Sequence, residues 1–126
     1  MTTDGKKILL VEDEPDAREI YLDILKGENM DGTGVGDGTE ALEALERNKY
    51  DLILLDIIMP KMDGVETLGR IKQSPDKYGT PKVVMLSNIG GDIAIDKAME
   101  LGADGYMLKS ETEPEDFINV VKKYLE

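Results

Sequence analysis

The chain has 126 residues, which suits one domain with an ordinary hydrophobic core and leaves no room for two. It carries 27 acidic and 15 basic residues, a net charge of −12, and this balance argues against direct binding of nucleic acid. Because there is no cysteine and no histidine, disulfides, thiolate metal sites and histidine catalysis are excluded. Any chemistry must therefore use carboxylates, hydroxyls, lysine or a bound metal.

The sequence shows neither a membrane span nor a secretion signal. No apolar run approaches the roughly 20 residues that cross a bilayer, and the first residues lack a basic segment followed by an apolar one. We therefore expect a cytoplasmic protein that does not contact membranes. The sequence leaves open whether it is a stand-alone protein or part of a larger one.

The first half of the chain predicts three strands with two helices between them. Residues 7–11 are short and aliphatic, as in a strand buried on both faces. A helix follows, because Pro15 suits a first helical turn and Gly27 a helix end. A weaker strand, residues 30–35, precedes a second helix, and the aliphatic strand 52–55 comes next. The apolar stripes of the two helices are Ala17, Ile20, Tyr21, Ile24 and Leu25, and Ala41, Leu42 and Leu45.

The second half continues the alternation with three helices and two strands. The third helix contains Gly69, which costs about 1 kcal/mol relative to alanine in a helix interior. Residues 82–86 form an aliphatic strand, residues 105–108 a weaker one, and Pro114 begins the last helix. The three apolar stripes are Val65, Leu68 and Ile71; Ala94, Ala98 and Leu101; and Phe117, Val120, Val121, Tyr124 and Leu125.

Five strand–helix units predict a single α/β domain over residues 1–126, with a five-stranded parallel sheet and five helices on both faces. The strand order 2-1-3-4-5 would make the first and third strands neighbours. The glycine-rich stretch 32–38 fits neither a dinucleotide fingerprint nor a calcium loop, because Leu42 stands where that loop needs glutamate. We interpret this stretch as a strand end and a turn.

Charged and hydroxyl side chains follow four of the predicted strands. Glu12 and Asp13 follow the first strand, Asp56 the third, Ser87 the fourth and Lys109 the fifth. Open parallel sheets bind ligands outside the carboxyl ends of their strands, and three carboxylates in one cleft repel one another unless a cation is present. Oxygen ligands alone predict a hard cation such as Mg²⁺. The alternative is that the first two acids only cap the following helix.

The strand ends also carry the motifs of a known family. Residues 8–14 (ILLVEDE) and, most specifically, residues 54–64 (LLDIIMPKMDG) resemble the receiver domain of two-component response regulators. Residues 84–87 (VMLS) and 102–109 (GADGYMLK) match the last two strands of that family. The resemblance covers essentially the whole chain in the family's order and spacing, and it implies a flavodoxin-like (βα)5 fold.

The resemblance implies that Asp56 is the phosphoacceptor nucleophile, taking a phosphoryl group as an acyl phosphate. It also implies that Glu12, Asp13, Asp56 and the backbone carbonyl of Ile58 hold Mg²⁺ or Mn²⁺, partly through water. The donor is then a phosphohistidine on a sensor histidine kinase or a histidine phosphotransfer protein. The chain would be a signalling domain rather than an enzyme, catalysing only its own phosphorylation and dephosphorylation.

By the same resemblance, the remaining strand-end residues turn phosphorylation into a switch. Ser87 would hydrogen-bond the phosphoryl group and pull the loop 88–92, Lys109 would pair with the group, and Tyr106 would rotate inward. The surface for an output protein is then the fourth predicted helix, the fifth strand and the fifth helix. The protein would be a monomer or a phosphorylation-dependent dimer.

Several positions depart from the family pattern or bear on the lifetime of the phosphoryl group. Ser110 follows Lys109 at a position where the family usually has proline joined by a cis peptide bond. A cis bond before a residue other than proline costs about 2.5–4 kcal/mol, so the sequence leaves open where the Lys109 side chain points. Asn88 stands where a small residue is usual. Ile58 and Ile89 flank the family's path for an attacking water, which predicts slow self-dephosphorylation.

Two other functions compete with this interpretation. An aspartate-nucleophile phosphatase of the haloacid dehalogenase type needs a second aspartate two residues after the nucleophile, and Ile58 stands there. A receiver-fold interaction module without phosphotransfer could lose its reactive residues, whereas this chain has every reactive residue type.

Overall fold

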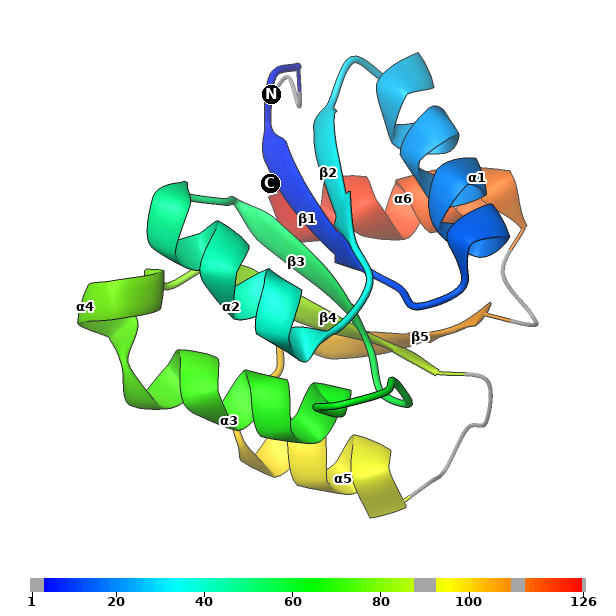
Figure 1. The fold of residues 1–126 in the computed structure, drawn as a ribbon. Coiled ribbons are helices and arrows are strands. Elements are labelled where there is room, and N and C mark those ends of the chain that lie inside the picture. Colours follow the sequence, from blue (N-terminus) through cyan, green and yellow to red (C-terminus); the bar gives the residue numbers. More distant parts are fainter. Residues whose placement is uncertain (1–3, 88–92, 110–112, 126) are drawn as a thin grey trace.

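The structure is a computed structural model that describes residues 4–87, 93–109 and 113–125. Five parallel strands form one sheet in the order β2-β1-β3-β4-β5, with helices on both faces (Figure 1). The strands are β1 (Lys7–Val11), β2 (Asp31–Val35), β3 (Leu52–Asp56), β4 (Lys82–Ser87) and β5 (Gly105–Leu108). The helices are α1 (Pro15–Gly27), α2 (Gly38–Arg47), α3 (Gly64–Gln73), α4 (Pro75–Tyr78), α5 (Ile93–Glu100) and α6 (Pro114–Leu125).

The predicted fold class and strand order are confirmed, and one helix was missed. β3 and β4 each extend one residue beyond the prediction, to Asp56 and Ser87. The described residues form six helices instead of five, because α4 is a separate single turn. Its four residues include one large apolar side chain, Tyr78, which is too few to show a helical period. The fourth and fifth predicted helices are therefore α5 and α6.

Alternate residues of the central strands face opposite sides of the sheet and build two separate cores. One core packs against α2, α3 and α5, and the other packs against α1 and α6, as the two groups of helices in Figure 1 show. The strand residues of the first core are Leu9, Val11, Ile53, Leu55, Val83 and Met85. Those of the second core are Ile8, Leu10, Leu52, Leu54, Val84, Leu86 and Met107.

The strand register sets the direction of the acidic side chains. Val11 of β1 pairs with Leu55 of β3, so Glu12 and Asp56 come next on adjacent strands. Because strand side chains alternate, both acids continue the rows that face α1 and α6. A shift of one residue in this register would turn Asp56 toward α2 and α3.

Gly64, which begins α3 directly under Asp56, should not tolerate a side chain. Its N–H donates to the carbonyl of Ile57 at 2.8 Å, and an added Cβ would collide with the backbone oxygen of Asp56. We expect Gly64→Ala to destabilise the fold by about 1–3 kcal/mol. Gly69→Ala in the same helix meets only Leu101 Cδ1 at 3.9 Å and should stabilise by about 1 kcal/mol. Urea unfolding measures both, and equal stability of the two variants would contradict this account.

Candidate functional site

Three carboxylates meet at the carboxyl ends of β1 and β3. Glu12 and Asp56 are buried, Asp13 is exposed, and one oxygen of each lies within 4.8 Å of the others. This cluster of oxygen donors suits a hard divalent cation, which commonly takes one or two carboxylates and keeps several waters. Ile58 lies two residues after Asp56 with its side chain 70% exposed, and the role of its carbonyl stays a prediction.

Lys109 reaches into the same cluster from the end of β5. Its Nζ lies 2.5 Å from Glu12 Oε1 and 3.1 Å from Asp56 Oδ2, and its side chain is 14% exposed. The lysine therefore neutralises part of the buried negative charge and stands within reach of a group bound to Asp56. The Lys109–Ser110 peptide lies outside the described residues, as do Asn88, Ile89 and the loop 88–92.

The electrostatics of the cluster favour a proton or a cation on Asp56. Burial and the neighbouring Glu12 raise the pKa of Asp56 to about 7, although Lys109 acts in the opposite direction. Burial also acts to raise the pKa of Glu12, but hydrogen bonds with Asp56 and Lys109 outweigh it and lower that pKa. Burial acts to lower the pKa of Lys109, and its contacts with the two acids raise it. Near neutral pH, Asp56 is thus poised between its two forms.

The other predicted site residues lie at the same edge of the sheet or beside it. Ser87 is the last residue of β4 and is buried, and Asp56 pairs in register with the preceding Leu86. Tyr106 on β5 is 47% exposed. The inward rotation of Tyr106, and the contact of Ser87 with a phosphoryl group, stay predictions.

Arg18 is a residue of the site region that the sequence analysis missed. It lies on α1, and its Nη1 donates to the backbone carbonyl of Glu12 at 2.8 Å. The signal in the sequence was an arginine shortly after the acids together with alternating glycines, Gly34 in β2 and Gly36 just after it. Taken alone, those glycines predict only a strand end and a turn.

Comparison with known proteins agrees with this geometry. The family model "Response regulator receiver domain" matches residues 8–122. The chain is 34% identical over 109 residues to the DNA-binding response regulator MtrA of Mycolicibacterium smegmatis, covering 86% of this chain and 46% of that protein.

Two solved structures are similar over nearly the whole length. The receiver domain of a signal transduction histidine kinase from Syntrophus aciditrophicus has a TM-score of 0.85 and 30% identity, covering 96% of this chain and 90% of that one. The receiver domain of a Pseudomonas aeruginosa sensor histidine kinase has magnesium coordinated in its active-site cleft. It has a TM-score of 0.83 and 25% identity, covering 96% of this chain and 98% of that one.

The family match, together with the fold and the acidic site, defines a signalling domain rather than a classical enzyme. The chain belongs to the response regulator receiver domain family of two-component systems. It spans less than half the length of the MtrA protein that it matches. Among the helices of the described residues, none is long and apolar enough to cross a membrane.

Proposed function

We propose that this chain is a phosphorylation-dependent switch whose phosphoacceptor is Asp56. The donor is a phosphohistidine of a sensor histidine kinase or a histidine phosphotransfer protein, and Mg²⁺ or Mn²⁺ is the cofactor. The observation that carries the proposal is the buried Asp56 carboxylate, which lies beside two further acids and 3.1 Å from the Lys109 ammonium. The surface of α5, β5 and α6 would then present the signal to an output protein.

The chain's own residues account for the transfer step. A carboxylate oxygen of Asp56 attacks the phosphorus, a P–O bond forms, and the P–N bond to the donor imidazole breaks. The Lys109 ammonium lies close enough to neutralise charge on the transferred group, and the Ser87 hydroxyl would hydrogen-bond to it. When bound at Glu12, Asp13 and Asp56, the divalent cation supplies two more positive charges. Positioning and charge neutralisation suffice here, so the absence of histidine is no obstacle.

The geometry does not favour a phosphatase. A hydrolase of the aspartate-nucleophile type needs a carboxyl group two residues after the nucleophile to protonate the leaving group. In this chain that position holds Ile58, whose apolar side chain is exposed to solvent. An interaction module with a silent site is also disfavoured, because burial and the neighbouring Glu12 make a charged Asp56 destabilising despite the contact with Lys109, unless Asp56 binds a proton or a cation.

Incubation with acetyl phosphate tests the proposal directly. We expect intact-mass spectrometry to show the addition of one phosphoryl group with Mg²⁺ and none when a chelator removes the cation. After removal of the donor the modification should decay slowly, and loss within seconds would reject the predicted slow self-dephosphorylation. No modification from acetyl phosphate or from a phosphorylated histidine kinase would support the silent module. Continuous hydrolysis of a small phosphoester would support the phosphatase.

A further inference from the structure

Arg18 holds the backbone of Glu12 at the edge of the acidic cluster. Its guanidinium Nη1 donates to the Glu12 carbonyl at 2.8 Å, and the Glu12 N–H donates to the carbonyl of Val35 at 3.0 Å. The peptide groups on both sides of Glu12 are therefore fixed, one by β2 and one by α1. Glu12 is fully buried, and its side chain meets Lys109.

Two glycines, Gly34 in β2 and Gly36 directly after it, leave room for this arginine. A Cβ on Gly34 would lie 2.8 Å from Cδ1 of Leu22 and 3.0 Å from Cγ and Cδ of Arg18, and a Cβ on Gly36 would lie 3.2 Å from Nη1 of Arg18. These distances are shorter than ordinary contacts between non-bonded atoms. Neither glycine has a positive φ, so the backbone does not require glycine there. Gly34 instead leaves room for Leu22 and the stem of Arg18, and Gly36 leaves room for the guanidinium.

The loop after β1 needs such a restraint because it concentrates negative charge. Glu12, Asp13 and Glu14 are consecutive, and the carboxylate of Asp56 lies beside the first two. Repulsion favours movement of this loop away from Asp56. The hydrogen bond from a charged donor opposes that movement.

We propose that Arg18 is a positioning residue that fixes Glu12 and Asp13 in the arrangement that binds the cation. The proposal deepens the proposed function and rests on it. Groups that orient metal ligands without touching the metal typically change metal affinity by 10–100-fold when they are removed.

Calorimetric titration of the full chain with Mg²⁺ alone tests the proposal. Arg18→Met keeps a long apolar stem and removes the donor, and it should weaken Mg²⁺ binding about 10-fold. At saturating Mg²⁺ the rate of phosphorylation by acetyl phosphate should return close to wild type. In the cation-free variant the Glu12 amide should exchange its hydrogen faster, whereas a purely structural role would lower the melting temperature without changing Mg²⁺ affinity.

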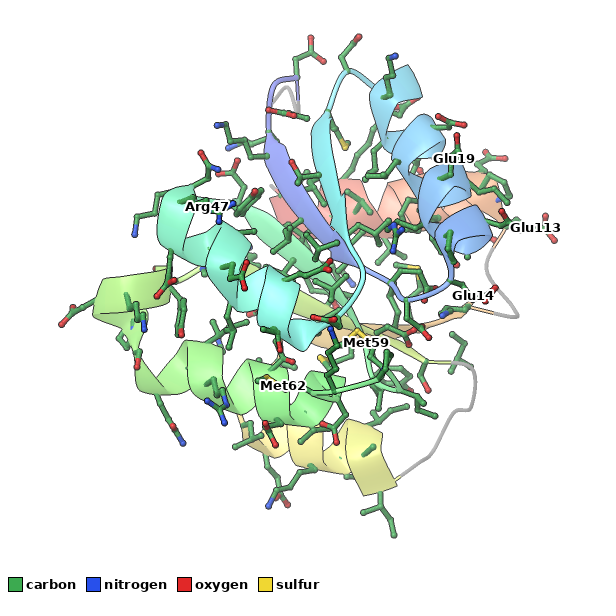
Figure 2. The ribbon with its side chains drawn as sticks, in the orientation of Figure 1. Glu14, Glu19, Arg47, Met59, Met62 and Glu113 are labelled. Carbon is green, nitrogen blue, oxygen red and sulfur yellow. The ribbon has the colours of Figure 1, made fainter. Side chains whose placement is uncertain are left out.

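Three further variants test whether the effect on Mg²⁺ binding comes from the position of the Arg18 guanidinium, from its positive charge or from a change in folding. Arg47→Met removes a positive charge from the last turn of α2, far from the loop of Glu14 (Figure 2), and should bind Mg²⁺ like wild type. Gly36→Ala keeps the charge but displaces the guanidinium, and it should weaken binding to a smaller extent. Arg18→Lys keeps the charge with a different reach and should also bind more weakly than wild type.

The outcomes distinguish this proposal from the function on which it rests. A wild-type chain that binds no Mg²⁺ and accepts no phosphoryl group overturns the proposed function. A wild-type chain that does both, with unchanged affinity in Arg18→Met and Gly36→Ala, overturns only the role of Arg18. Wild-type affinity in Arg18→Lys would show that charge alone matters and would equally overturn positioning.

Discussion

Replacing Asp56 by asparagine should abolish phosphorylation and at the same time stabilise the cation-free protein. Phosphorylation is lost because the amide is not a nucleophile for phosphoryl transfer. Stability rises because the variant removes a buried negative charge that lies next to Glu12. Intact-mass spectrometry with acetyl phosphate and Mg²⁺ measures the first effect, and thermal unfolding in the presence of a chelator measures the second.

The stabilising effect of Asp56→Asn should depend on pH. The pKa of Asp56 is about 7 in the folded protein against 3.8 for the unperturbed side chain, so the folded state binds the proton more tightly. The wild type therefore loses stability as pH rises from about 4 through about 7, whereas the variant lacks this loss. We expect a gain on the order of 2 kcal/mol at about pH 8, or several degrees in Tm, and a small gain at about pH 4.

Asp31→Asn is the matched control for this experiment. Asp31 is exposed at the start of β2, at the amino end of the sheet and away from the cluster. The Asp31→Asn variant should be phosphorylated like wild type, and its Tm should depend on pH as that of wild type does. Undiminished phosphorylation of Asp56→Asn would place the acceptor elsewhere. An unchanged Tm at about pH 8 would show that the charge on Asp56 is not destabilising.

Lys109→Met should be the most destabilising change at the site. The ammonium contacts both buried acids, and its removal leaves two carboxylates without their cationic partner. Breaking a buried ion pair by deleting one partner costs about 3–5 kcal/mol. Because the pKa of Lys109 is raised, its contribution is fully present at about pH 8 and would be lost only at more alkaline pH. Urea unfolding without cation should show a loss of about 3 kcal/mol, smaller at about pH 5, where Asp56 is protonated.

Lys122→Met provides a comparison at the surface. Lys122 pairs with Glu28 at 2.6 Å, but both side chains are more than a third exposed, so its loss should cost less than about 1 kcal/mol. Added Mg²⁺ should recover part of the stability of Lys109→Met. It should not change the difference in unfolding free energy between Lys122→Met and wild type. Phosphorylation of Lys109→Met should remain slow even with Mg²⁺. Equal destabilisation of the two variants would contradict the structural role of Lys109.

The sequence predicted the strands and the acids at their ends because these depend on local patterns, whereas the strand order agreed with the fold that the family resemblance implies. Aliphatic runs mark buried strands, and the strand-end rule then places Glu12 and Asp56 at one edge. The turn α4 was missed because Pro75–Tyr78 is too short to show a period. Arg18 was missed because its hydrogen bond depends on how α1 crosses Gly34 and Gly36, which is a tertiary relationship. The contact of Lys109 with Glu12 likewise needed coordinates.

Asp56 is the last residue of β3, and this position bears on how fast the surrounding structure can rearrange. β3 is buried along its whole length and bonded to both β1 and β4, so we expect its amides to exchange with solvent only when the entire domain opens. Such opening is many orders of magnitude slower than side-chain rearrangement. Under the proposed function, phosphorylation of Asp56 would leave the sheet in place, and its effect would pass along the strand ends at the edge of the sheet rather than through movement of the strands.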